Sequence, residues 1–203
     1  MSKTTTRSLQ DYLSFGYLFL LSLGIIKDSI YYSFLGINIL SYSNVLDVLL
    51  SPVIYLTRHI MLPLFIIGTI LLAYVTVHLN PFLYKRFRDK RWYIKYTKRP
   101  IAELDERYAK PIPPERFLWM AASFIFVFYI GLGVGGGATM KEKLQSKTIP
   151  LDHTIVFVDK TAVKVTLIGH NNQYLFYAQK GDQHVTVVPV QGNVRSIVQL
   201  SQE

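Results

Sequence analysis

Two long apolar runs separated by a dense block of positive charge constrain this chain more than any other feature. One run extends from Met61 to Leu79 and the other from Phe117 to Met140, and neither contains Lys, Arg, Asp or Glu. A helix needs about 20 such residues to cross the hydrocarbon core of a bilayer. Loops rich in Lys and Arg between apolar runs are typical of the cytoplasmic side of membrane proteins. The sequence therefore predicts an α-helical polytopic membrane protein.

The overall composition supports this class of protein. Half of the 203 residues are hydrophobic and 17% are charged, against roughly 25% charged residues in a typical soluble domain. The net charge is +9, and eleven of the 22 Lys and Arg side chains lie in residues 81–116. The chain has no cysteine, which excludes disulfides, thiolate catalysis and cysteine-ligated metals.

The first apolar stretch is shorter and is interrupted by Lys27 and Asp28. A span over about residues 12–35 is expected if the two charges lie near the far interface, where they can pair. Two interpretations of the pair stay open: an interfacial pair near the lipid headgroups, or an intramembrane ion pair on a conduction path. We interpret the stretch as a retained span and not as a signal peptide, because no small-residue cleavage site follows it.

Residues 36–58 are apolar but broken by polar residues and by Pro52. Ser43 is the candidate N-cap of a short helix over about residues 43–51, which Pro52 is expected to end. The uncharged part has about half the length of a span. We therefore expect an interfacial or re-entrant helix in this region.

The C-terminal residues change to a β pattern. Five short runs rich in Val, Ile, Thr and Tyr follow from His153, at intervals of about ten residues, with turn-type residues between them. This predicts a small all-β domain, either a five-stranded antiparallel meander or an SH3-like barrel. In the second run Val163, Val165 and Leu167 alternate with a face on which Ile168 is the one apolar residue. Because ~50 residues give a marginal core, we expect oligomerisation or packing on the spans to support this domain.

These expectations divide the chain into six parts. They are an N-terminal cytoplasmic tail (1–11), a segment with transmembrane helices 1 and 2 and the interfacial helix (12–80), a basic cytoplasmic loop (81–116), transmembrane helix 3 (117–137), a linker (138–152) and the C-terminal β domain (153–203).

The basic block at residues 84–99 is the first candidate site. Its cations alternate with aromatic side chains, and we assign it as a topology anchor that contacts anionic lipid headgroups. Nucleic acid also binds to cations beside aromatic rings, but it is the less favoured partner because the block begins at a membrane edge. The anchor residues are Lys85, Arg86, Arg88, Lys90, Arg91, Lys95, Lys98, Arg99 and Trp92.

Glycines at the end of the third apolar run are the second candidate site. Gly131 and Gly135, and likewise Gly133 and Gly137, form overlapping G-x-x-x-G spacings, which let helix backbones approach closely. We expect them to pack helices, either within the chain or between copies in a homo-oligomer. The same letters match G-x-G-x-x-G, but a dinucleotide site would need a preceding strand and a crossover helix. We therefore reject a cofactor here.

Residues with catalytic potential do not form a recognisable motif. The histidines are scattered, and we expect His153, His170 and His184 to be polar turn residues and not metal ligands. The carboxylates in residues 103–106 fall on a predicted exposed helix, and we interpret them as solvated. We expect no enzyme activity, no cofactor and no metal.

The charge distribution sets the expected orientation and function. The positive-inside rule places the N-terminus and the basic loop in the cytoplasm and the β domain outside, in the cytoplasmic (inner) membrane of a bacterium. We expect a non-enzymatic accessory, sensor or scaffold protein whose β domain binds a protein partner or a signal. The alternative is an oligomeric channel or membrane-disrupting effector, as in toxin or phage-defence systems, with Gly131 and Gly135 at its interface.

Overall fold

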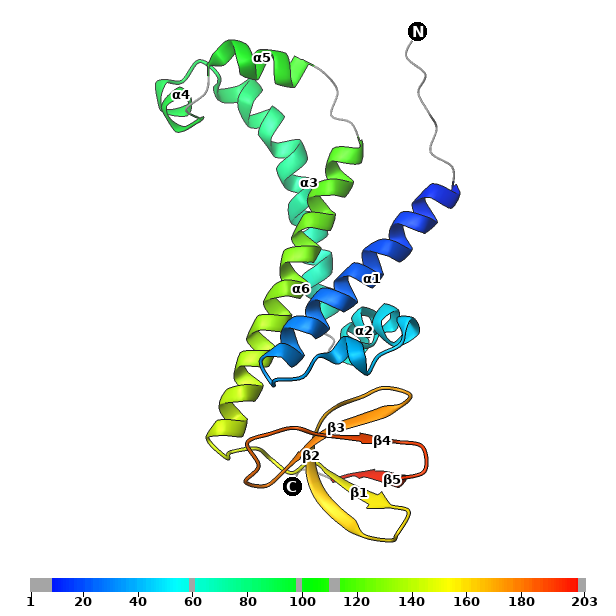
Figure 1. Cartoon of the computed structure of the whole chain (residues 1–203). Helices are drawn as coiled ribbons and strands as arrows, with labels where there is room; N and C mark the ends of the chain where they lie inside the picture. The colour runs from blue at the N-terminus through cyan, green and yellow to red at the C-terminus, as the bar shows by residue number, and fades with distance from the viewer. Residues whose placement is uncertain (1–8, 59–60, 98–99, 110–113, 201–203) are drawn as a thin grey trace. The chain divides into compact units, whose positions relative to one another are not determined.

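The computed structural model describes residues 9–58, 61–97, 100–109 and 114–200. This part of the chain contains three helices long and apolar enough to cross a membrane, and a C-terminal five-stranded antiparallel sheet (Figure 1). The predicted combination of long apolar helices with a β region is therefore confirmed. The chain divides into two compact units, one formed by Met1–Tyr55 with Tyr129–Glu203 and the other by Leu56–Phe128.

Three of the helices have the length and composition of membrane spans. They are α1 (Leu9–Ser33), α3 (Met61–Phe87) and α6 (Pro114–Gln145), and the shorter ones are η1 (Ile39–Ser41), α2 (Val45–Arg58), α4 (Arg91–Thr97) and α5 (Ile101–Ala109). Few side chains of the long helices are buried within the protein: in the apolar window of α3 the share is 6%. An all-round apolar helix whose side chains point outward matches a lipid environment and not a soluble core.

Two of the long helices continue beyond their expected ends. The predicted second span stopped at residue 80, but α3 passes through Pro81 and ends at Phe87. A proline removes one helix hydrogen bond and kinks the helix without necessarily ending it. The predicted third span stopped at residue 137, but α6 runs through the glycines to Gln145. Tertiary packing of those glycines, described below, outweighs their low helix propensity.

Helix α2 differs from the prediction at both ends. Asn44, and not Ser43, caps it: the Asn44 side chain accepts from the Asp47 N–H at 2.8 Å, and Asp47 accepts from the Asn44 N–H at 3.1 Å. This reciprocal pair is a capping box. Pro52 lies inside the helix and does not end it. With 14 residues, α2 is about 21 Å long, which is too short for a hydrocarbon core of ~30 Å.

Within the Leu56–Phe128 unit, α3 and the first half of α6 pack side by side and antiparallel. The Phe65 and Phe128 rings stack with their centroids 4.3 Å apart, and Tyr74 meets Phe117 edge-on at 6.3 Å. Ala73 of α3 is fully buried.

The five strands form an open antiparallel sheet in the order β4-β3-β2-β1-β5. They are β1 (His153–Phe157), β2 (Ala162–His170), β3 (Tyr174–Gln179), β4 (Thr186–Pro189) and β5 (Val194–Gln199). The first four follow the predicted meander, but β5 pairs with β1 at the opposite edge. The predicted SH3-like barrel is wrong, because the sheet is not closed. The short β4 ends in a proline, which cannot donate a ladder hydrogen bond.

The central strands β2 and β3 carry buried side chains on both faces of the sheet, which the strand pattern did not predict. On one face Ile155, Val165 and Leu175 form a core of their own with Tyr177. On the other face Ile168 and Phe176 pack against the helices. The polar face expected for β2 is therefore a contact surface, since Thr166 is also buried and donates to the Pro150 carbonyl at 2.6 Å.

The second sheet face shares one core with the helices of its unit. Tyr32 at the end of α1 packs on Phe176 with ring centroids 5.1 Å apart, and Leu144 of α6 belongs to the same cluster. Tyr42, which follows η1, meets Phe176 at 5.9 Å. Its carbonyl accepts from the Asn171 side chain at 2.8 Å. The expectation that the helices support the small sheet thus matches the packing within this unit.

The close approach of Tyr32 to Gly169 gives a test of this shared core. A Cβ at Gly169 would collide with the Tyr32 hydroxyl oxygen. We predict that Gly169→Ala lowers the free energy of unfolding by about 1–3 kcal/mol, as overpacking does elsewhere. Tyr32→Phe removes the colliding atom and should restore most of the loss in the double variant. The measurement is unfolding of the full chain in detergent micelles, and equal losses in the single and double variants would contradict the contact.

Candidate functional site

The C-terminal half of α1 is the point at which the other elements of its unit meet. Gly24 contacts α2, Gly133 and Gly137 of α6 contact α1 residues from Lys27 to Phe34, and Tyr32 contacts the sheet. The polar side chains of this region define a third candidate site, in addition to the basic block and the glycines. We call Lys27, Asp28, Ser51 and Tyr55 the Lys27 cluster.

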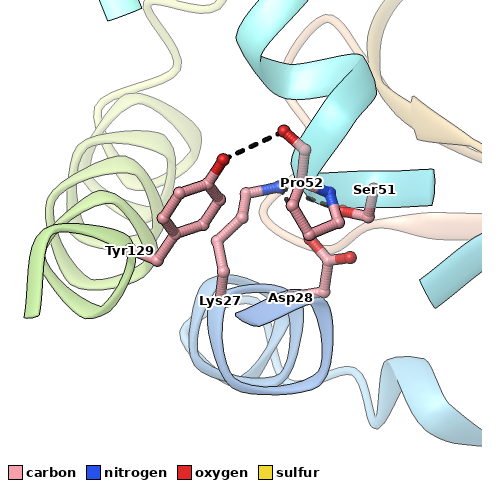
Figure 2. Close-up of polar contacts among 5 residues, drawn as sticks. All are labelled: Lys27, Asp28, Ser51, Pro52 and Tyr129. Atoms are coloured by element: carbon pink, nitrogen blue, oxygen red, sulfur yellow. Dashed lines mark hydrogen bonds and ion pairs between the residues drawn. The ribbon is translucent and has the colours of Figure 1, made fainter. Parts of the chain in front are cut away.

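Lys27 is buried, although it lies in a helix long and apolar enough to span a bilayer. Its ammonium group lies 2.7 Å from Asp28 Oδ1, and the two side chains are 10% and 14% exposed. The same nitrogen is 3.5 Å from Ser51 Oγ and 4.3 Å from the centre of the Tyr55 ring. Figure 2 shows the Lys27 side chain directed from α1 toward α2. The cluster therefore ties these two helices together.

Pro52 is held beside the cluster by contacts that explain its place inside a helix. Tyr129 of α6 donates its hydroxyl hydrogen to the Pro52 carbonyl at 3.0 Å (Figure 2). Pro52 has no N–H for the Val48 carbonyl four residues earlier. That carbonyl lies directly against Gly24, where a Cβ would collide with it. Pro52 leaves the Val48 carbonyl without its helical donor, and Gly24 leaves room for that carbonyl against α1. The sequence did not predict this relation between the two residues.

The arrangement of the Lys27 cluster is that of a neutral, internally paired group. One cation faces one carboxylate, and the hydroxyl and aromatic partners also stabilise the ammonium group. A buried charge needs such partners, because leaving it unpaired is costly. Under either interpretation of the pair from the sequence, the contacts of Lys27 join α1 to α2.

Removing one member of the ion pair should therefore cost more than removing both. We predict that Lys27→Met or Asp28→Asn lowers the free energy of unfolding by about 3–5 kcal/mol, because each leaves a buried, unpaired charge. The double variant should recover a large part of that loss. Lys143→Met, at an exposed position of α6, is the matched control and should change stability by less than about 0.5 kcal/mol. The measurement is chemical unfolding in micelles, and simple addition of the two single losses would rule out the coupling.

The four candidate glycines fall into two pairs with different surroundings. A Cβ on Gly133 would lie 2.8 Å from the Lys27 carbonyl oxygen, and one on Gly137 would lie 2.9 Å from the Tyr31 carbonyl oxygen. A Cβ on Gly131 or Gly135 would meet nothing within 4 Å. Gly133 and Gly137 therefore pack α6 onto α1 within the chain. Gly131 and Gly135 face away from the described residues.

These two pairs supply an internally controlled experiment. We predict that Gly133→Ala and Gly137→Ala each destabilise the protein by about 1–3 kcal/mol, because the added carbon meets backbone oxygen. Gly131→Ala and Gly135→Ala should be neutral or stabilising by up to about 1 kcal/mol, because alanine is the better helix former. Thermal unfolding of the four variants in micelles is the measurement, and the same effect at all four positions would contradict this packing.

The described part of the basic block presents its charges on the surface. The exposed members are Lys85, Arg86, Arg88, Lys90, Arg91, Trp92 and Lys95, whereas Lys98 and Arg99 lie outside the described residues. Trp92 is 57% exposed, and its ring lies 5.4 Å from that of Phe87. Exposed cations beside a partly exposed indole are suited to a headgroup layer.

Asp105 organises the inner side of the basic block, which the sequence analysis did not foresee. It accepts from the buried Tyr84 hydroxyl at 2.6 Å and from Arg88 at 3.0 Å. Asp105 is therefore a partly exposed carboxylate, 43% accessible, that also has partners within the loop. An exposed pair of this kind contributes little energy, so its effect is to fix where α5 lies relative to the end of α3.

Titratable groups of the sheet have local structural partners. Two hydrogen bonds from Thr161, through its hydroxyl at 2.6 Å and its N–H at 2.9 Å, hold the pKa of Asp159 below its usual value. Burial raises the pKa of Tyr177, with the charge of Asp182 adding to the effect. His153 contacts Asp152 at 2.8 Å. Within the described ranges, the His, Asp and Glu side chains form no group of three or more that could hold a metal ion.

Comparison with known proteins assigns no family to this chain. No family model, curated protein or solved structure matches this chain.

Proposed function

We propose that this chain is a non-enzymatic integral membrane protein of the bacterial inner membrane, an accessory, sensor or scaffold whose β domain binds a partner or signal outside the cytoplasm. The observation that carries the proposal is the core shared by the sheet and the ends of α1 and α6, built on Tyr32, Leu144 and Phe176. A domain fixed to its spans in this way changes the packing of those spans when its own packing changes. This is what a sensor or scaffold at a membrane surface needs.

The helix directions support the proposed orientation. Gly133 contacts Lys27 and Ile30, and Gly137 contacts Tyr31 and Phe34, so α1 and α6 run parallel. If α6 begins at the cytoplasmic face beside the basic block, then α1 begins there too. This agrees with the positive-inside rule, and it leaves α2 as a helix that does not cross the bilayer.

Absence of cysteine from the chain makes the orientation directly measurable. We predict that Gln183→Cys, in the exposed turn before β4, reacts with a membrane-impermeant maleimide on intact spheroplasts. Lys90→Cys, in the exposed basic block, should react only after the membrane is opened, because its side is cytoplasmic. Labelling detected by a gel shift is the measurement, and the reverse pattern would overturn the proposed sidedness.

The proposed role is tested by complementing a deletion strain. A variant with several exposed sheet residues replaced, expressed at the wild-type level and with the same labelling pattern, should fail to complement. A variant with Lys90, Arg91 and Lys95 replaced by Gln should still complement, because Lys85 and Arg86 keep the anchor. Full complementation by the sheet variant would contradict a binding role for the β domain.

The alternative, an oligomeric channel or membrane-disrupting effector, is favoured by one observation. The Gly131 and Gly135 face of α6 is open to contact with another helix. A channel of this type predicts loss of membrane potential on strong induction, and Gly131→Leu with Gly135→Leu should abolish that loss. An unchanged potential in the wild type would exclude this alternative.

A further inference from the structure

The two edges of the open sheet differ in what they offer to another strand. Strand β4 has four residues, and β5 has six, of which the last five are exposed. An unprotected edge presents unpaired N–H and C=O groups that template the addition of a further strand. The edge strands β4 and β5 differ in how far these groups are protected.

The β4 edge carries a protective proline. The Val190 N–H donates to the Gln173 carbonyl, and the register pairs Leu175 with Val188. Because backbone groups alternate in direction along a strand, Val187 and Pro189 point away from β3. Pro189 has no N–H, which is a common way of blocking an edge.

The β5 edge has no such block. The Leu200 N–H donates to the Asp152 carbonyl, and Val198 lies opposite Thr154. The same alternation directs the backbone groups of Ile197 and Gln199 away from β1. The described part of the chain places no strand against them. This edge therefore offers two donors and two acceptors in the spacing of an antiparallel ladder.

We propose that the β5 edge pairs antiparallel with the β5 edge of a second copy of this chain, around a two-fold axis at Val198. In this register Ile197 of each copy exchanges both hydrogen bonds with Gln199 of the other, so that all four outward groups of each strand are used. Val198, which is 50% exposed, lies against its own equivalent. Arg195, the one charged residue of β5, stays at the far ends, so like charges do not meet.

The membrane arrangement favours this occupant over an unrelated extended peptide. Two copies in one bilayer with the same orientation are related by an axis along the bilayer normal. The two-fold axis of an antiparallel strand pair is perpendicular to the sheet. One face of this sheet packs on the ends of α1 and α6, and the strands run across the direction of those helices (Figure 1). The two-fold axis of the strand pair therefore points along the bilayer normal, as the axis relating two copies in one membrane must. This holds whichever side of the membrane carries the sheet.

The cysteine-free chain allows a direct test with full-length protein in micelles. Non-hydrogen-bonded antiparallel neighbours have Cα atoms about 4.5 Å apart, which is within the range for a disulfide. Val198→Cys should therefore form disulfide-linked dimers under mild oxidation. Gln183→Cys, at an exposed position in the turn before β4, is the control and should form no disulfide-linked dimer.

A second change separates edge pairing from chance collision. Adding Gln199→Pro removes an outward N–H while leaving the bonds to β1 intact, and it should weaken dimerisation roughly tenfold or more. Gln199→Ala keeps the N–H and should leave dimer formation unchanged. Equal cross-linking of Val198→Cys and Gln183→Cys, or a Val198→Cys dimer insensitive to Gln199→Pro, would overturn the proposal. Sedimentation of the cysteine-free protein should show a dimer that Gln199→Pro, but not Gln199→Ala, dissociates.

Discussion

The close packing of α1 against three neighbours is the constraint on which the N- and C-terminal unit depends. Gly24 admits the α2 backbone, and Gly133 and Gly137 admit the α1 backbone to α6. Each of these approaches requires the absence of a side chain. Between apolar helices in lipid, close packing of this kind is one of the interactions that drive association, because apolar side chains gain little by leaving one apolar environment for another. The polar contacts of Lys27 and Tyr129 then fix α2 at the junction.

The small sheet also depends on the helices that meet at α1. Its own core on one face is limited, and a unit of ~50 residues is marginal alone. The second face completes it by packing on Tyr32 and Leu144, so the helix ends supply part of the β domain's core. This dependence gives the proposed sensor or scaffold its physical basis, because the sheet and the helix ends share one hydrophobic core.

The sequence predicted those elements that depend only on the local pattern of residues. Long charge-free runs predict apolar helices from composition alone, and five β-rich runs between turn residues predict five strands. It did not predict features that depend on contacts between residues far apart in the sequence. Pro52 inside α2 depends on Gly24 and Tyr129, and the burial of Ile168 depends on Tyr32 and Ile39, which precede it by more than a hundred residues. The choice between Gly133 and Gly131 as packing residues likewise depends on which face of α6 meets α1, and both spacings are identical in the sequence.

Hydrogen exchange of the full chain tests the shared core most directly. Amides of β3 from Leu175 to Ala178 lie in the buried part of the sheet, and their protection reports its stability. If the helix ends complete the sheet, Tyr32→Ala should speed exchange in β3 as well as at the end of α1, whereas Leu13→Ala, at an exposed position of α1, should not. Unchanged β3 exchange in Tyr32→Ala would show that the sheet is stable by itself, and it would contradict the account.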